Sequence, residues 1–330
     1  MFKAGPKNLI TDVQGLLVGH ATDEAVRSGV TVLLCAADWR AAVDVRGGGP
    51  GTRETDALAP ENLIGRAHAI VLAGGSVFGL AAADGVTSAL SARGDGLRLR
   101  PGAPPIPIVP AAVLHDLGNG GDKAWGEDPP YRALGIRALR NAAADFALGS
   151  VGAGRGAMAG LIKGGIGSAS IDLGSGIVVG ALVALNSVGS ALMPDGSTYW
   201  AWPFEIDAEF GGAPPPRGGV TSGDPAPDDS RLLEIGRLQP GANTTLVVVA
   251  CSAALATGEC KRIAIMAHDG IARAVRPAHT PYDGDVVFAL AGGGVPVAGQ
   301  AQREAQIGRL GSAAADCTAR AIARAVHLSR

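Results

Sequence analysis

Asn243 and Thr244 form the junction in this 330-residue chain that is best suited to chemistry. A segment rich in proline and glycine precedes them, and the apolar run Leu246–Ala250 follows. A threonine hydroxyl is a weak nucleophile unless a base lies beside it. A threonine at a new chain end carries such a base, because an α-amino group has a pKa of about 7.7–8.0. We therefore interpret the junction as a self-cleavage site that makes Thr244 the nucleophile of an amide hydrolase.

The same three residues, 243–245, also allow simpler interpretations. Asn favours turns and Thr favours strands, so the local pattern alone favours a turn that leads into a strand. Asn243 and Thr245 also match an N-glycosylation acceptor. The first residues of the chain contain no apolar signal core that would support that use.

Four other polar side chains stand next to apolar or glycine-rich stretches. Lys163 lies among glycine and apolar residues, where lysine is seldom found without a partner. Asn186 lies at the end of a long apolar run that is typical of a buried strand. Asp283 and Asp285 stand two residues apart just before an expected strand, Val286–Leu290, so they can face the same side. The alternative for this pair is a solvated turn.

Three segments resemble known motifs without matching them. Gly47–Asp56 lacks the lysine of a phosphate-binding loop, so we expect a tight structural loop. Ser76 lacks the second glycine of a nucleophile elbow, so we expect it to cap a helix at Leu80–Leu90. Gly152–Gly156 lacks the spacing and the acidic partner of a dinucleotide site. We expect no cofactor, and the four dispersed cysteines suggest neither a zinc site nor a disulfide framework.

The composition fits a globular protein with a sizeable core. Hydrophobic residues make up 47% of the chain and charged residues 18%, which excludes a disordered chain. A net charge of −2 gives no reason to expect nucleic acid or an anionic membrane as a partner. The longest apolar run, 177–188, is too short to span a bilayer. We expect a cytoplasmic protein with reduced thiols.

Residue periodicity predicts the elements that must position these side chains. Apolar runs predict strands at 11–20, 28–35, 41–46, 68–73, 104–110, 176–187, 244–250 and 286–290. Helical spacing of apolar residues predicts helices at 131–147, 259–275 and 302–328, in addition to the one after Ser76. The region 211–241, rich in proline and glycine, is expected to be a mobile linker with a short helical piece near 230–238.

Taken together, these motifs resemble the DmpA-type aminopeptidase family (L-aminopeptidase/D-esterase), which includes the nylon-oligomer endohydrolases. The matching segments are Asn8–Asp23, Asp44–Leu58, Leu72–Asp84, Ile108–Leu117, Ser150–Gly167, Val178–Gly189, Gly241–Ala250 and Ala267–Phe288. They extend over nearly the whole chain, and the 190–240 region diverges most.

The resemblance implies an α+β fold, a four-layer αββα sandwich like that of N-terminal-nucleophile hydrolases. It implies one domain, 1–330, that cuts itself into an α chain, Met1–Asn243, and a β chain, Thr244–Arg330. The family favours tetramers of processed protomers. The implied catalytic set is Thr244 as nucleophile, Asn186 as an oxyanion donor, Lys163 as a catalytic-site lysine, Asp283 and Asp285 as the pair that orients the amine, and Tyr131 as the active-site tyrosine.

Aminopeptidases of this family usually carry serine as nucleophile and a Ser/Glu pair, whereas this chain has Thr244 with Asp283 and Asp285. The departure favours the nylon-oligomer hydrolases. We therefore expect an amidohydrolase that acts on short peptides or on 6-aminohexanoate oligomers. The alternatives are an aminopeptidase acting on peptides, amides and esters, and an acyltransferase related to the ornithine acetyltransferases.

Overall fold

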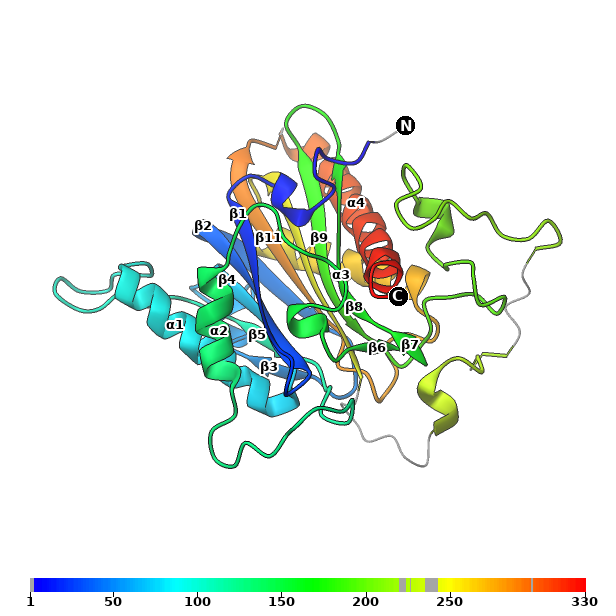
Figure 1. The fold of residues 1–330 in the computed structure, drawn as a ribbon. Coiled ribbons are helices and arrows are strands. Elements are labelled where there is room, and N and C mark those ends of the chain that lie inside the picture. Colours follow the sequence, from blue (N-terminus) through cyan, green and yellow to red (C-terminus); the bar gives the residue numbers. More distant parts are fainter. Residues whose placement is uncertain (1–2, 220–223, 226, 235–242, 298) are drawn as a thin grey trace.

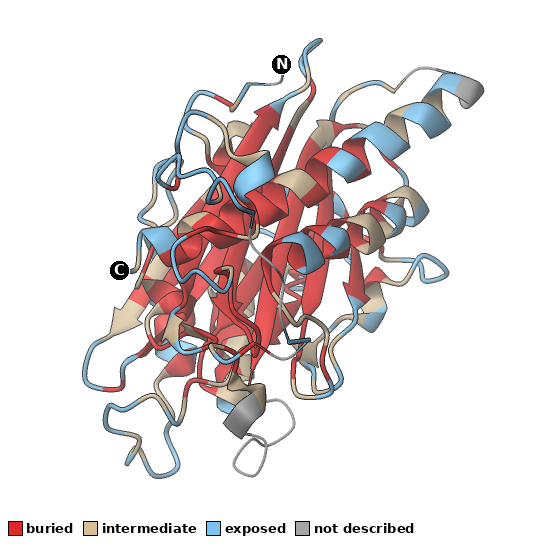
Figure 2. Cartoon of the chain, turned by 90° about the vertical axis from the view of Figure 1, so that its right-hand side faces the viewer, coloured by how far each residue is buried: buried red, intermediate tan, exposed pale blue. Residues whose placement is uncertain are grey.

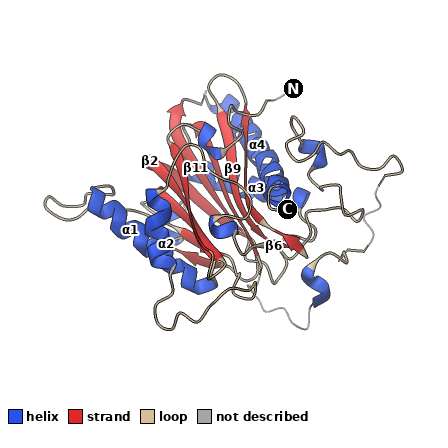
Figure 3. Cartoon of the chain, viewed as in Figure 1, coloured by secondary structure: helices blue, strands red, loops and turns tan. Residues whose placement is uncertain are grey.

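A computed structural model describes residues 3–219, 224–225, 227–234, 243–297 and 299–330. A nine-stranded sheet forms its centre, with helices on both sides (Figures 1 and 3). The strands are β1 (Leu16–Asp23), β2 (Ser28–Val45), β3 (Gly51–Arg53), β4 (Arg66–Ala73), β5 (Ala111–Val113), β6 (Met158–Ala159), β7 (Ile162–Lys163), β8 (Gly165–Asp172), β9 (Val178–Asn186), β10 (Thr244–Ala253) and β11 (Val286–Val295). The α-helices are α1 (Ala81–Arg93), α2 (Tyr131–Arg140), α3 (Thr257–Ala274) and α4 (Gln300–His327).

Strand β2 joins the two halves of the sheet. Its first part pairs with β1 on one side and β4 on the other, and its second part pairs with β11. The pairing with β4 is irregular between Leu34 and Trp39, where the strand changes partners. From β11 the sheet continues through β10 and β9 to β8. One long strand therefore carries the chain from one layer into the next.

The alternation of side chains along the strands produces two sheet layers with a core between them. Leu246 and Val248 of β10 belong to this inner core, together with Leu33 of β2 and Leu72 of β4 from the other half. All four side chains are fully buried. Successive strand residues point to opposite faces of a sheet, so the residues next to these four point away from the inner core, toward the outer faces.

Helices cover the two outer faces. Val247 of β10 packs with residues of α3 and α4, and Val71 of β4 packs with residues of α1 and α2. Figure 2 shows the strands buried beneath α3 and α4, whose outward faces are partly exposed. The chain is therefore a four-layer αββα sandwich, which confirms the predicted fold class. Among the described residues, no helix has both the length and the apolar character needed to cross a membrane.

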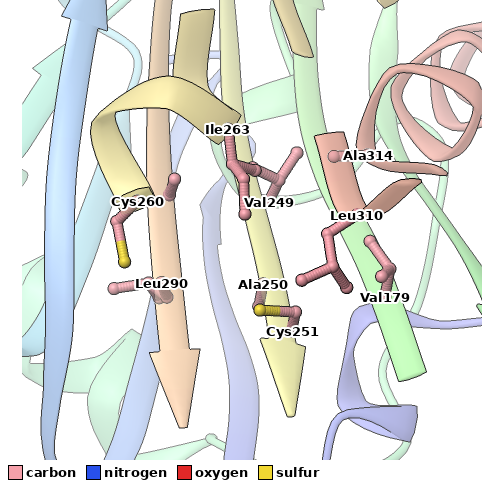
Figure 4. A pocket seen from close by; sticks show the side chains of 10 residues that line it. Val179, Val249, Ala250, Cys251, Cys260, Ile263, Leu290, Leu310 and Ala314 are labelled. Carbon is pink, nitrogen blue, oxygen red and sulfur yellow. The ribbon is translucent and has the colours of Figure 1, made fainter. Parts of the chain in front are cut away.

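A small apolar pocket lies in the outer core between β10 and helices α3 and α4 (Figure 4). Its walls include Val179, Ile263, Leu310 and the thiol-bearing Cys251 and Cys260. All four cysteines of the chain are buried and free. The pocket is at the opposite end of β10 from Thr244 and offers a ligand almost no polar group, so it is not the candidate site.

Several predicted elements differ from the structure in instructive ways. The two strands expected at 28–35 and 41–46 are one continuous strand, β2. The helix that begins at Tyr131 ends at Arg140, because Ala143 pairs with Val18 of β1 instead of continuing the helix. The prediction that Ser76 caps a helix was wrong. Ser76 begins a short 3-10 helix, and no described side chain caps α1.

Helices α3 and α4 pack closely together at Gly270, and this contact is testable. A Cβ atom on Gly270 would overlap the carbonyl oxygen of Ala315 and lie 2.7 Å from Cβ of Thr318. We expect Gly270→Ala to lower the free energy of unfolding by about 1–3 kcal/mol, measured by urea denaturation. Gly258→Ala on the same helix has open space around it and should change stability by less than about 1 kcal/mol. Equal effects of both substitutions would contradict the packing argument.

Candidate active site

Thr244 is the first residue of β10 and is buried between two neighbouring segments. It pairs with Asn186, the last residue of the antiparallel strand β9. On its other side β10 runs parallel to β11, so the residues that precede β11 lie at the same edge of the sheet. The topology alone therefore gathers Thr244, Asn186 and the loop 279–285 at one place.

The hydroxyl of Thr244 donates a short hydrogen bond to the carbonyl oxygen of Asn243, the residue before it. The N–H of Gly284 donates to the same oxygen at 2.8 Å. A Cβ atom on Gly284 would lie only 2.7 Å from Oγ1 of Thr244, so glycine leaves room for the hydroxyl. The peptide bond between Asn243 and Thr244 thus has a hydroxyl beside its carbonyl and a backbone donor on its oxygen.

Asp285 is buried and accepts hydrogen bonds at both carboxylate oxygens. The backbone N–H of Thr245 donates to Oδ1 at 2.6 Å. His279 donates to Oδ2 twice, from its backbone N–H at 3.1 Å and from its ring nitrogen Nδ1 at 2.7 Å. Asp285 therefore holds the start of β10 against the loop 279–285.

Asp283 is equally buried, and its hydrogen-bond donors among the described residues are uncharged groups. The N–H of Val188 donates to Oδ1 at 3.1 Å, and Thr280 donates to Oδ2 from its N–H at 3.0 Å and its hydroxyl at 2.7 Å. Burial, together with the nearby charge of Asp285, raises the pKa of Asp283 to about 6. Both aspartates are 1% exposed, which replaces the solvated-turn interpretation with a buried carboxylate pair.

The glycine-rich loop after β2 supports this pair from behind. A Cβ atom on Gly47 would overlap the backbone of Asp283 and Asp285. Gly49 donates its N–H to the carbonyl of Asp283 at 2.9 Å. The loop positions the aspartates through backbone contacts, and its glycines are needed because the two backbones touch.

Asn186 is fully buried, and both ends of its side-chain amide are engaged. Its Oδ1 accepts from the N–H of Met158 at 3.0 Å, and its Nδ2 donates to the carbonyl of His115 at 3.1 Å. One of the two hydrogens on Nδ2 is used by His115, which leaves the other for a group at the start of β10. The structure thus places the predicted oxyanion donor in the strand pair that contains Thr244.

Lys163 and Tyr131 are placed less directly. Lys163 is an exposed residue of β7 that pairs with Met158, the residue bonded to Asn186. Within the described part of the chain, its ammonium group has no hydrogen-bond or ion-pair partner. Tyr131, the first residue of α2, is buried in the outer core and donates to the hydroxyl of Ser28 at 3.1 Å. The contacts in the structure do not bring it to Thr244, and its role stays a prediction.

A piece of the linker lies against the junction. The N–H of Arg231 donates to the carbonyl of Val188 at 2.9 Å, and its guanidinium donates to the side-chain Oδ1 of Asn243 at 2.7 Å. Arg231 opens the short 3-10 helix Arg231–Glu234. The remainder of the expected helical piece, 235–238, and the rest of the linker up to 242 lie outside the described residues.

Sequence reasoning missed two residues that contact this site, Arg231 and His279. Arg231 stands in a segment whose composition marks only a linker. His279 directly precedes the Thr-Pro turn that leads to the aspartates, and a titratable ring so close to two carboxylates was the available signal. Both donate to groups that the sequence had already singled out, Asn243 and Asp285.

The model of Peptidase family S58 matches residues 8–330. The chain belongs to this family. It is 43% identical over 330 residues to an uncharacterized aminopeptidase of Mycobacterium tuberculosis, covering 96% of this chain and 92% of that protein. It is 30% identical over 295 residues to a 6-aminohexanoate-oligomer endohydrolase of Kocuria sp., covering 87% of this chain and 75% of that one.

Solved structures agree with these sequence matches. A Burkholderia sp. beta-aminopeptidase superimposes with a TM-score of 0.68 at 26% identity, covering 98% of this chain and 88% of that chain. The L-aminopeptidase D-Ala-esterase/amidase of Ochrobactrum anthropi, described as a variant of the Ntn hydrolase fold, gives 0.67 at 20% identity, covering 100% and 88%. The resemblance to DmpA-type aminopeptidases is confirmed, and this S58 protein is a hydrolase of peptide or amide bonds.

The room that Gly284 leaves for Thr244 provides a test of the site. A methyl group at position 284 would push against Oγ1 of Thr244 and lie 2.8 Å from the carbonyl of Gly49. We expect Gly284→Ala to lower kcat/KM for an amino-acid p-nitroanilide on the order of 100-fold, because small displacements of a nucleophile are costly. Gly294→Ala, on the strand β11 that follows Gly284, would bring a Cβ atom no closer than 3.8 Å to the carbonyl oxygen of Ser252 and should retain activity. Full activity of Gly284→Ala would show that the hydroxyl does not react from this position.

Proposed function

We propose that this S58 protein cuts itself between Asn243 and Thr244, and that the released threonine is the nucleophile of an amidohydrolase. Its substrates are short peptides or linear oligomers of 6-aminohexanoate. The observation that carries the proposal is the contact of the Thr244 hydroxyl with the carbonyl of Asn243, to which Gly284 also donates. A nucleophile, its target and a donor for the developing oxyanion are thus next to one another.

The cutting step follows from this contact. Oγ1 of Thr244 attacks the carbonyl carbon of Asn243, and the N–H of Gly284 stabilises the negative charge that develops on the oxygen. The C–N bond then breaks, the hydroxyl proton passes to the leaving nitrogen, and Asn243 remains as an ester on Oγ1. Water hydrolyses the ester to a carboxylate at Asn243 and a free hydroxyl on Thr244, which now has its own amine.

That amine is the base of the catalytic cycle. When neutral, it takes the hydroxyl proton as Oγ1 attacks the amide carbonyl of a substrate, which gives an acyl-enzyme and releases the amine product. The buried carboxylates of Asp283 and Asp285 orient the new ammonium group when it is charged. The remaining amide hydrogen of Asn186 is directed at the oxyanion, and Lys163 supplies positive charge from β7.

The second candidate function is that of an aminopeptidase, which removes residues from the end of a peptide instead of cutting inside an oligomer. The name of the Mycobacterium tuberculosis relative, at 43% identity, favours an aminopeptidase. Incubation with an amino-acid p-nitroanilide, its N-acetylated form and a 6-aminohexanoate tetramer separates the two. Cleavage that requires a free amine supports the aminopeptidase, and internal cleavage of the tetramer supports the endohydrolase. Turnover that requires an added amine acceptor would instead indicate an acyltransferase.

Substitution of the nucleophile tests self-cleavage directly. We expect Thr244→Ala to remain one polypeptide of 32.9 kDa by denaturing mass spectrometry and to have no measurable amidase activity. The control is Thr245→Val, because the neighbouring hydroxyl is buried without a hydrogen-bond partner among the described residues and valine has nearly the same shape. This variant should still give two chains. Cleavage of Thr244→Ala at the same bond would refute the proposal.

The contact between Arg231 and Asn243 predicts a second effect on maturation. The guanidinium holds the side chain of the residue that is attacked, so Arg231→Ala should slow the appearance of the two chains about tenfold, in line with a charge-assisted hydrogen bond. The measurement is the time course of cleavage of freshly purified precursor. Arg217→Ala, at an exposed position in the same linker, should mature at the normal rate. Equal rates for Arg231→Ala and the unaltered chain would exclude this positioning role.

A further inference from the structure

His279 contacts the carboxylate pair but has no part in the mechanism above. Its ring nitrogen Nδ1 lies 2.7 Å from Oδ2 of Asp285, and the ring side chain is 25% exposed whereas Asp285 is 1% exposed. The backbone φ of His279 is +55°, in the left-handed region that favours glycine. A histidine kept in a conformation that costs free energy suggests that the imidazole itself is needed.

The groups around the imidazole favour its charged form. Burial alone would lower the pKa of His279. Its hydrogen bond to Asp285, the negative charges of Asp285 and Asp283, and the backbone of His268 act in the opposite direction. Together they outweigh burial and raise the pKa of His279 above its usual value. The other ring in contact is that of His268 on α3, with centroids 4.9 Å apart and planes at 72°. Burial lowers the pKa of His268 to about 4, so this ring is neutral and does not repel a charged His279.

The charged groups behind His268 are one carboxylate and two cations that pair with it. His268 donates from Nε2 to the carbonyl of Asp44 at 3.1 Å, which leaves its Nδ1 unprotonated. The carboxylate of Asp44 pairs with Lys261 at 2.6 Å and with Arg46. These groups leave no unpaired negative charge behind His268, so the negative charge that His279 meets comes from the aspartate pair.

The two aspartates differ in one respect. The described donors to Asp283 are neutral, whereas Asp285 accepts from an imidazole with cationic character. We propose that His279 is a positioning residue that holds Asp285 as a carboxylate and thereby leaves Asp283 as the member of the pair that takes up a proton. This inference rests on the proposed function, since it assigns charge states to the pair that we propose to orient the amine of Thr244.

The consequence is a fixed negative charge at the start of β10 and a second, titratable one beside it. With both aspartates ionised, the new ammonium group of Thr244 is held and slow to lose its proton. With Asp283 protonated, one negative charge remains, and the amine is released more easily. The imidazolium thus gives the two carboxylates different charge states, because a cation favours the charged form of the carboxylate with which it shares a hydrogen bond.

Removal of the imidazole tests the inference on the processed enzyme. His279→Gly suits the positive φ and leaves a space that free imidazole can enter. We expect the acid limb of the kcat/KM profile for an amino-acid p-nitroanilide to move to lower pH by about one unit, because an aspartate pair that shares a proton holds the ammonium group of Thr244 less strongly and lets it lose its proton at lower pH. Added imidazole should move it back. Ser175→Gly makes the same backbone change at an exposed position with φ +55° and should leave the profile unaltered.

An unmoved acid limb in His279→Gly, or a loss of activity without rescue by imidazole, would show that the ring only fills space. A second measurement needs no activity. In the uncleaved Thr244→Ala precursor, the NMR titration of His279 should have a midpoint above about 6.5, and Asp285→Asn should lower it. A midpoint unaffected by Asp285→Asn overturns the inference. If Thr244→Ala itself hydrolyses the substrate, the proposed function fails, whatever His279 does.

Discussion

The contact between the hydroxyl of Thr244 and the carbonyl of Asn243 is the interaction on which the proposed chemistry depends. It exists because β10 begins at Thr244, beside the end of β9 and next to the loop that leads into the parallel strand β11. The sheet fixes the residue after the junction, and Gly284 fixes the carbonyl before it. A flexible turn would sample many geometries, whereas a bond held from both sides is kept near the arrangement needed for attack.

The rest of the fold maintains that edge of the sheet. Two layers of strands joined through β2 place the glycine-rich loop 47–49 against the backbone of the aspartates. The helices on both outer faces complete the burial of the strands. The resulting low exposure of Asp283 and Asp285 makes each of their hydrogen bonds stronger than it would be in water, and burial raises the pKa of Asp283.

Part of this arrangement could be predicted from the sequence, for physical reasons that differ between elements. The helices α3 and α4 were predicted within about two residues because their apolar positions repeat at helical spacing. The helix from Tyr131 was predicted too long, since the alanines after Arg140 favour a helix locally while the contact of Ala143 with β1 decides otherwise. Asp283 and Asp285 were singled out correctly, but their burial comes from a loop more than 200 residues away in the chain. No spacing rule marks Arg231 or His279.

Thr244 at a free chain end is the central claim. Intact-mass spectrometry of the purified, unaltered protein under denaturing conditions, followed by N-terminal sequencing, tests it most directly. The account predicts two polypeptides, one ending at Asn243 and one beginning with Thr244-Thr245-Leu246. A single polypeptide of 32.9 kDa that hydrolyses amides would contradict it, because an internal threonine has no amine to act as its base.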